Sequence, residues 1–279
     1  MKKISRRSFL AAAGLSVAAL ALTACGGSSA STASSVASSA ASSEAASTSA
    51  AAGELTTVEA GKLTMATNAT FPPYEMTTDA GEFEGIDIET AQAIADKLGL
   101  ELQIDDMDFD AALLSVQQGK ADIVMAGVTV TDERKAVMDF SDSYATGIQS
   151  IIVPEGSDIA SPDDLAGKKI GTQRGTTGYI YCTDDFGEDA VVAYDSGLTA
   201  VQALNNGQVD AVVIDNAPAQ EFIAANPGLK ILDTSYAEED YAIGMAKGSS
   251  LEDVVNAALE ELKADGTLQS IVDKYITAE

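Results

Sequence analysis

Apolar and polar positions alternate in a regular way from about residue 60 to the end of the chain. The apolar run 63–67 predicts a strand. The segment 87–98 has apolar residues at helical spacing, and Gly99 follows it, where a left-handed C-cap is favoured. Short strands that alternate with amphipathic helices predict an α/β fold.

One pattern occurs twice, at 111–124 and at 198–213. Each copy predicts a helix, a glycine stop, a short turn and a strand led by Asp. The pattern indicates two lobes with one such unit each, although two ordinary αβ units could also match by chance. Ligands of α/β sheets bind at the carboxyl ends of strands. The segment 126–129 and Asp215 are therefore candidate site positions.

Further helices and strands are predicted in the second half of the chain. Segment 161–164 has Ser at a cap position and Pro at the first helical position, which predicts a helix start. Segment 168–172 predicts a strand, and 174–178 opens the next helix. The segment 251–275 predicts two helices separated near Gly266.

The N-terminal region predicts export rather than fold. Residues 1–25 combine a basic start, a short apolar run and a terminal Cys25, which resembles a lipobox in which Cys25 is lipidated. The pair Arg6 and Arg7 also resembles a twin-arginine signal, so the export route stays open. An uncleaved anchor is the alternative, but the apolar run is shorter than the ~20 residues that span a bilayer. Residues 26–56 are rich in Ser and Ala and predict a flexible tether.

Charge and composition exclude several functions. The chain has 43 acidic and 16 basic residues, a net charge of −27, which argues against nucleic acid as a partner. Histidine is absent, which excludes histidine-dependent triads and imidazole-ligated zinc; carboxylate catalysis stays open. We expect no metal and no cofactor. Two cysteines give no disulfide framework, and Cys182 is expected to be a buried free thiol.

Three features suggest a site for a small zwitterion. Thr131 can cap a helix whose first turn carries Arg134, and a guanidinium can grip a carboxylate with two parallel hydrogen bonds. The loop 175–178 offers N–H groups and hydroxyls at a helix start, as an anion cradle would. Asp215 ends an apolar strand and could hold an ammonium group. Each feature alone is explained as well by a surface Arg, a tight turn or an exposed strand end.

Seven segments together resemble the polar amino-acid-binding proteins of ABC importers, in their lipoprotein form. The resemblance extends from about residue 61 to 278, and its most specific part is the Thr-x-Thr-x-x-Arg stretch that ends at Arg134. The matching segments are 66–74, 85–89, 108–110, 127–134, 140–142, 171–177 and 210–215.

This resemblance implies a two-lobed periplasmic-binding-protein type II fold. Each lobe would be a mixed sheet flanked by helices, with two hinge crossovers between the lobes. Lobe 1 would comprise 57–146 plus 240–279, and lobe 2 would comprise 149–236.

The resemblance also implies roles for individual residues. Arg134 and Thr177 would hold the ligand α-carboxylate. Thr129 and the Gly127 backbone would complete the polar cup, and Thr176 in the predicted cradle is a further binding candidate.

Asp215 would hold the ammonium group, and Phe71 and Phe109 would sandwich the side chain, with Tyr74 a further candidate face. Asn68 stands where many cation-binding relatives carry an acid, which favours a neutral polar ligand over lysine or arginine. An inward-turned Glu75 or Asp87 would instead favour a basic ligand, and Arg174 leaves an acidic ligand open. Arg174 has no counterpart in the pattern; it would face either the ligand side chain or solvent.

The expected function is capture of an amino acid outside the cytoplasm and delivery to an ABC permease, without catalysis. The protein would be a monomer, held at the cell membrane by lipid on Cys25 and facing the extracytoplasmic side. A dehydratase-like enzyme on the same fold and a sensor-only receptor are the alternatives.

Overall fold

The computed structural model describes residues 55–276. The export signal, Cys25 and nearly all of the expected tether therefore lie outside the described residues. Within 55–276, none of the helices combines the length and the apolar character needed to cross a membrane. The folded unit contains two mixed sheets and one small antiparallel sheet.

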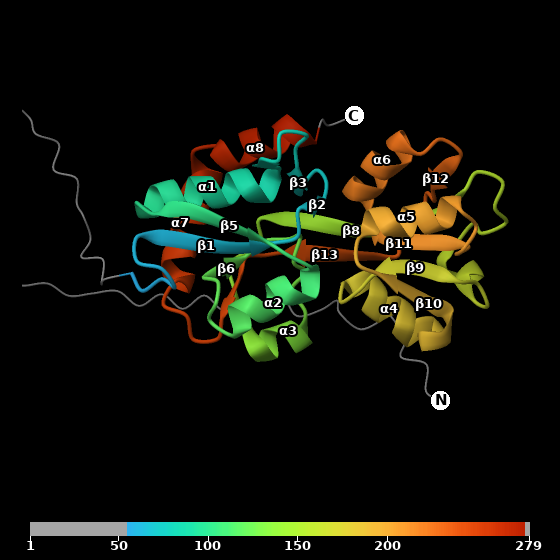
Figure 1. The fold of residues 1–279 in the computed structure, drawn as a ribbon, viewed down its shortest axis with the longest axis horizontal. Coiled ribbons are helices and arrows are strands. Elements are labelled where there is room, and N and C mark those ends of the chain that lie inside the picture. Colours follow the sequence, from blue (N-terminus) through green and yellow to red (C-terminus); the bar gives the residue numbers. More distant parts are fainter. Residues whose placement is uncertain (1–54, 277–279) are drawn as a thin grey trace, which may run out of the picture. The chain divides into compact units, whose positions relative to one another are not determined.

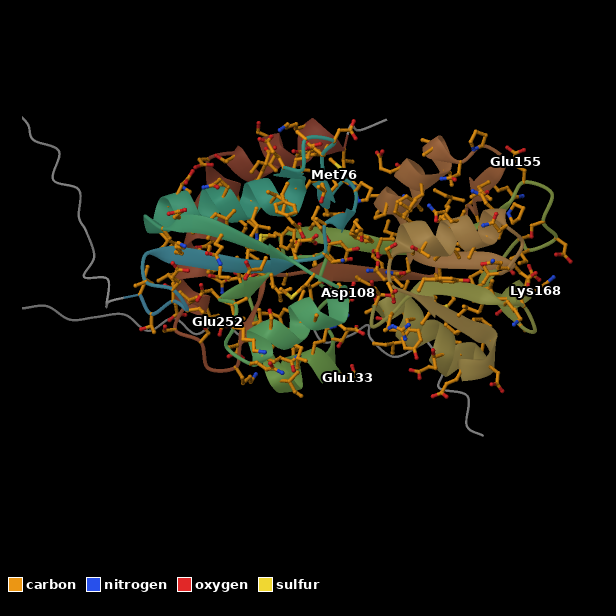
Figure 2. The ribbon with its side chains drawn as sticks, in the orientation of Figure 1. Met76, Asp108, Glu133, Glu155, Lys168 and Glu252 are labelled. Atoms are coloured by element: carbon orange, nitrogen blue, oxygen red, sulfur yellow. The ribbon has the colours of Figure 1, made fainter. Side chains whose placement is uncertain are left out.

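The first main sheet has the strand order β5-β1-β6-β14-β7. Strand β1 pairs in parallel with β5 and β6, and β14 returns from the C-terminal part of the chain to pair antiparallel with β6 and β7. Figure 1 shows α1 and α8 on one side of this sheet and α2 and α3 on the other. The strands are β1 (Lys62–Thr67), β5 (Glu101–Asp106), β6 (Ile123–Val124), β7 (Met138–Phe140) and β14 (Gly244–Ala246). The helices of this half are α1 (Ile86–Leu98), α2 (Phe109–Gln117), α3 (Asp132–Val137), α7 (Glu252–Ala264) and α8 (Thr267–Tyr275).

The second main sheet has the order β10-β9-β11-β8-β12, with β13 pairing β8. Figure 1 shows α5 and α6 on one side of this sheet and α4 on the other. The strands are β8 (Ala145–Pro154), β9 (Ile170–Gln173), β10 (Val191–Tyr194), β11 (Ala211–Asp215), β12 (Leu229–Ile231) and β13 (Ala237–Tyr241). The helices are α4 (Thr177–Phe186), α5 (Gly197–Asn205) and α6 (Asn216–Ala225), with the 3₁₀ turns η1 (Pro162–Leu165) and η2 (Glu188–Ala190).

Two antiparallel strands carry the chain between the two sheets. Strand β8 follows the first sheet and enters the second, and β13 leads back to β14. The first half of β8 pairs with β13, and its second half pairs with β11 and β12. This two-lobed arrangement with two crossovers confirms the expected fold class.

The small sheet lies between β1 and α1 in the chain. It has the order β2-β3-β4, with β2 (Thr70–Phe71), β3 (Glu75–Thr77) and β4 (Phe83–Glu84). Buried Phe71 and Glu75 are cross-strand partners here. The small sheet therefore places an aromatic ring and a carboxyl just beyond the carboxyl end of β1.

The repeated pattern is confirmed as one unit in each main sheet. Helix α2 leads to Gly119 at φ 65° and then to β6, while α5 leads to Gly207 at φ 68° and then to β11. The strand at 63–67 and the helix at 87–98 are also present, and Gly99 caps α1 at φ 69°.

The expected helix at 161–164 is only a 3₁₀ turn. Ser161 stands at the cap position, as predicted, and its N–H and hydroxyl both donate to Asp164 Oδ2, at 3.0 and 2.9 Å. The turn ends after Leu165, because Gly167 takes a left-handed φ of 78° and β9 follows almost at once. The predicted start of the helix was therefore correct, but β9 begins too soon after it for a longer helix to form.

Candidate functional site

A cavity of about 430 Å³ is lined by residues of both lobes. All nine residues predicted to bind ligand line it, namely Asn68, Phe71, Phe109, Gly127, Thr129, Arg134, Thr176, Thr177 and Asp215. The lining also includes three polar residues that were not predicted there, Glu75, Gln149 and Gln173. The lining is completed by apolar Ala126, Val213 and Ile214.

Arg134 is fixed in the cavity wall by its own helix and by the opposite lobe. The Thr131 side chain accepts a hydrogen bond from the Arg134 N–H, which confirms the predicted cap. The side chain is 8% exposed; Nη1 donates to the Thr129 carbonyl at 2.7 Å and Nη2 to the Gly175 carbonyl at 3.2 Å. Its guanidinium carbon lies 5.4 Å from the centre of the Phe109 ring. Arg134 thus has a fixed orientation, with guanidinium hydrogens left for an anion.

A buried carboxylate lies behind the hydroxyl groups of the predicted anion cup. Glu239 Oε2 accepts hydrogen bonds from Thr129 Oγ1 at 3.0 Å and Thr177 Oγ1 at 2.9 Å. Gln149 Nε2 also donates to it, at 3.1 Å. These bonds join the two lobes through the crossover strand β13. Each hydroxyl has a single proton and donates it to Glu239 here, so neither hydroxyl can also donate to a ligand carboxylate in this arrangement.

The start of α4 forms as the sequence indicated. Thr176 caps the helix by accepting from the Tyr179 N–H, and its own hydroxyl donates to the Gln173 carbonyl at 2.8 Å. Thr177 is 2% exposed at the first helical position. The partial positive charge of the helix start is therefore directed at the cavity beside Arg134.

Asp215 lies at the end of β11, as predicted, and is only 8% exposed. Tyr241 donates a hydrogen bond to Oδ1, and Gln149 Nε2 donates to Oδ2 at 2.7 Å. Gln149 can reach it because the two residues are cross-strand partners between β11 and β8. Burial raises the pKa of Asp215 to about 7, against the opposing effect of these two hydrogen bonds. A ligand ammonium beside it would favour the charged carboxylate again.

Phe71 and Phe109 supply two aromatic faces of the cavity. Gly127 is needed beside them, because a Cβ there would lie 2.9 Å from the Phe71 ring and the residue has a left-handed φ of 54°. The Gly127 N–H donates to Asp87 Oδ2 at 2.9 Å, so the expected backbone contribution to the cup is limited to its carbonyl group. Tyr74 does not line the cavity; it stacks behind Phe71, with ring centres 5.9 Å apart.

Asn68 is held by neighbours on both lobes. Its Oδ1 accepts from Gln173 Nε2 at 2.8 Å and from Thr70 Oγ1 at 2.9 Å. Its Nδ2 donates to the Met107 carbonyl at 2.8 Å. Most of the hydrogen-bonding capacity of this amide is therefore used within the protein.

Glu75 turns inward and lines the cavity with only 1% exposure. None of the described residues donates a hydrogen bond to either of its carboxyl oxygens. Asp87 lies beside it at 0% exposure. Burial raises the pKa of Glu75 well above its usual range and that of Asp87 to about 6.

Two further predicted residues lie away from the cavity. Arg174 does not line it; its side chain is 56% exposed and 3.7 Å from Asp195, and both residues line a second pocket together with Phe109. Cys182 is a free thiol at 0% exposure, as expected, and burial raises its pKa to about 12. Neither residue touches the space a ligand would occupy.

Sequence reasoning missed Gln149, Gln173 and Glu239. Gln173 stands inside the recognised segment 171–177, beside the cradle, so its position could have been inferred. Gln149 and Glu239 lie on the crossover strands β8 and β13, where no local motif marks them.

The arrangement suits binding rather than catalysis. The cavity has a fixed cation at one wall, a buried carboxylate from the other lobe and two aromatic faces. Within 55–276, no cluster of three or more acidic or cysteine side chains is arranged to hold a metal ion. The geometry thus defines a two-lobed binding protein for a small polar solute.

The sequence family agrees with this class. The chain belongs to the bacterial extracellular solute-binding proteins, family 3, whose family model matches residues 63–278. Its curated relatives are likewise named as binding proteins and not as enzymes.

Three similar proteins illustrate the range of the family. The L-cystine-binding protein TcyJ of Escherichia coli (strain K12) is 32% identical over 226 residues, which cover 79% of this chain and 85% of TcyJ. An ancestral arginine-binding protein bound to arginine is 43% identical with a TM-score of 0.74, covering 77% of this chain and 98% of that one. An ancestral arginine-binding protein bound to glutamine is 42% identical with a TM-score of 0.75, covering 78% of this chain and 99% of that one.

Proposed function

We propose that the chain captures a free α-amino acid between its two lobes outside the cytoplasm and delivers it to an ABC permease. One observation carries the proposal: buried Arg134 and buried Asp215 come from different lobes and line the same cavity. A guanidinium matches an α-carboxylate and a carboxylate matches an α-ammonium. A ligand with both groups links the lobes and favours their closure.

The lobes are proposed to close as two bodies about β8 and β13, with the boundaries 57–146 plus 240–279 and 149–236. The hydrogen bonds that already join the lobes, Asn68 to Gln173 and Arg134 to Gly175, support this. We further propose a monomer, anchored to the membrane by lipid on Cys25. A sensor-only receptor would have the same binding chemistry, and loss of amino-acid uptake on deletion of the gene separates the two roles.

The side chain of the ligand is proposed to end in hydrogen-bond donors, and a cation such as that of arginine suits the cavity best. Glu75 carries this argument, because a buried carboxyl without donors is costly unless a ligand supplies them. The neutral preference inferred from Asn68 stays the competing prediction. It has less support, since neighbouring residues occupy most of that amide. Arginine-binding relatives and a glutamine-bound one agree with a donor-rich side chain.

A thermal-shift screen of the twenty amino acids plus cystine tests the proposal. A ligand at 100 times its dissociation constant stabilises the protein by ~2.7 kcal/mol. We expect a clear rise in Tm with arginine or lysine. A rise with glutamine or cystine alone would restore the neutral prediction. No rise with any α-amino acid would refute the function.

A further inference from the structure

Two carboxyl groups lie together at the side of the cavity formed by the small sheet and α1. Glu75 comes from β3 and Asp87 from the first turn of α1. Both are almost completely buried, and only the Glu75 side chain lines the cavity. Asp87 Oδ2 accepts the Gly127 N–H, and the Tyr144 hydroxyl is a further hydrogen-bond partner of the Asp87 carboxyl.

Among residues 55–276, no cationic side chain lies close enough to Glu75 and Asp87 to offset their charge. Tyr74 and Tyr144 face it from the adjoining segments, and Asp106 and Asp215 add further negative charge. The cation in the cavity wall is Arg134, and it is bonded to carbonyls at the carboxylate-binding end.

Two carboxyls this close and this buried are not both ionised in the empty cavity. Burial and mutual repulsion raise the pKa of Glu75 well above its usual range, and burial raises that of Asp87 to about 6. One proton held by Glu75 can be donated to Asp87, which joins one oxygen of Glu75 to one oxygen of Asp87.

We propose that Glu75 and Asp87 share a proton that is kept when a neutral amide side chain binds and released when a cationic side chain binds. The inference rests on the proposed function. With the proton retained between the two carboxyls, the other oxygen of Glu75 faces the cavity and accepts an N–H of a neutral amide. With the proton released to solvent, the carboxylate accepts N–H bonds from a guanidinium or ammonium. The protonation state of the pair, and therefore the pH, thus determines whether an amide or a cationic side chain of the ligand is preferred.

The test compares arginine with glutamine by titration calorimetry from about pH 5 to about pH 8, in buffers of different ionisation enthalpy. Asp215 meets the same ammonium group in both ligands, so its protonation cancels in the ratio of the two dissociation constants. As pH rises, we expect the ratio of the dissociation constants to change in favour of arginine by up to ~10-fold per pH unit. Binding of arginine should release about one more proton than binding of glutamine.

Variants localise the effect. Glu75→Gln should weaken the binding of arginine and remove the pH dependence of the ratio of the arginine and glutamine dissociation constants. Asp87→Asn should move the dependence to lower pH, because Glu75 loses its charged neighbour. Glu82→Gln, an exposed carboxyl on the same segment, is the control and should match wild type.

Each outcome has a defined meaning. A ratio that stays constant across the pH range overturns the proposal, as does glutamine binding with no arginine or lysine binding at any pH. If arginine alone binds, wild type must release about one more proton than Glu75→Gln, and equal numbers overturn the proposal. Failure of every α-amino acid to bind would instead refute the proposed function.

Discussion

Replacing Arg134 by lysine tests the carboxylate grip without removing the charge. The buried guanidinium donates to two carbonyls, one on each lobe, and stacks over Phe109. An ammonium on a flexible stem cannot keep both contacts and also present two parallel N–H groups to a carboxylate. Loss of a buried, hydrogen-bonded charge contact costs ~2–5 kcal/mol, which corresponds to a ~30-fold to several-thousand-fold rise in Kd.

Calorimetry with the amino acid found in the screen measures this loss directly. The matched control is Arg174→Lys, because Arg174 is an exposed arginine outside the cavity and should retain affinity within ~3-fold. The Tm of ligand-free Arg134→Lys should stay near that of wild type, which separates lost binding from unfolding. Affinity of Arg134→Lys within a factor of two of wild type would refute the role of the guanidinium.

Four further predictions concern Asp215, the pH dependence of stability, Gly147 and Cys25. Asp215→Asn should weaken every α-amino acid tested, because it removes the partner of their common ammonium; an effect on one ligand only would make Asp215 a side-chain specificity residue. Burial raises the pKa of Asp215 from 3.8 to about 7, so between these values the native state holds more protons than the unfolded state. The Tm of the ligand-free protein should therefore fall as pH rises through this window, and a Tm curve for Asp215→Asn as steep as that of wild type would contradict this origin. Gly147→Ala should weaken binding, since its Cβ would lie 2.5 Å from the buried Tyr241 ring and 2.6 Å from Asp215 Oδ1, whereas Gly156→Ala meets nothing within 4 Å and serves as the control. Cys25→Ser should move the protein out of the membrane fraction, and unchanged partitioning would disprove the lipobox interpretation.

Local signals in the sequence were enough for much of the fold. The glycine that caps α1, the paired αβ units and the capped start of α3 depend on neighbouring residues, and each formed as expected. The turn at η1 shows the limit, because its length depends on how soon β9 must begin.

The site was predictable where a motif spans it and not where topology creates it. Arg134 and Thr177 stand in recognisable segments, so both could be named in advance. Gln149 and Glu239 act across strands, and their positions follow only from the pairing of β8 with β11 and β13. The inward turn of Glu75 depends on the small sheet, whose short strands carry almost no sequence signal.

The most direct test of an amino-acid trap is calorimetry with the preferred amino acid and two analogues, one lacking the α-carboxylate and one lacking the α-ammonium. If Arg134 and Asp215 hold these groups from opposite lobes, each deletion should weaken binding by at least ~30-fold, because it leaves a buried charge without its partner. Wild-type-like affinity for either analogue would contradict the account.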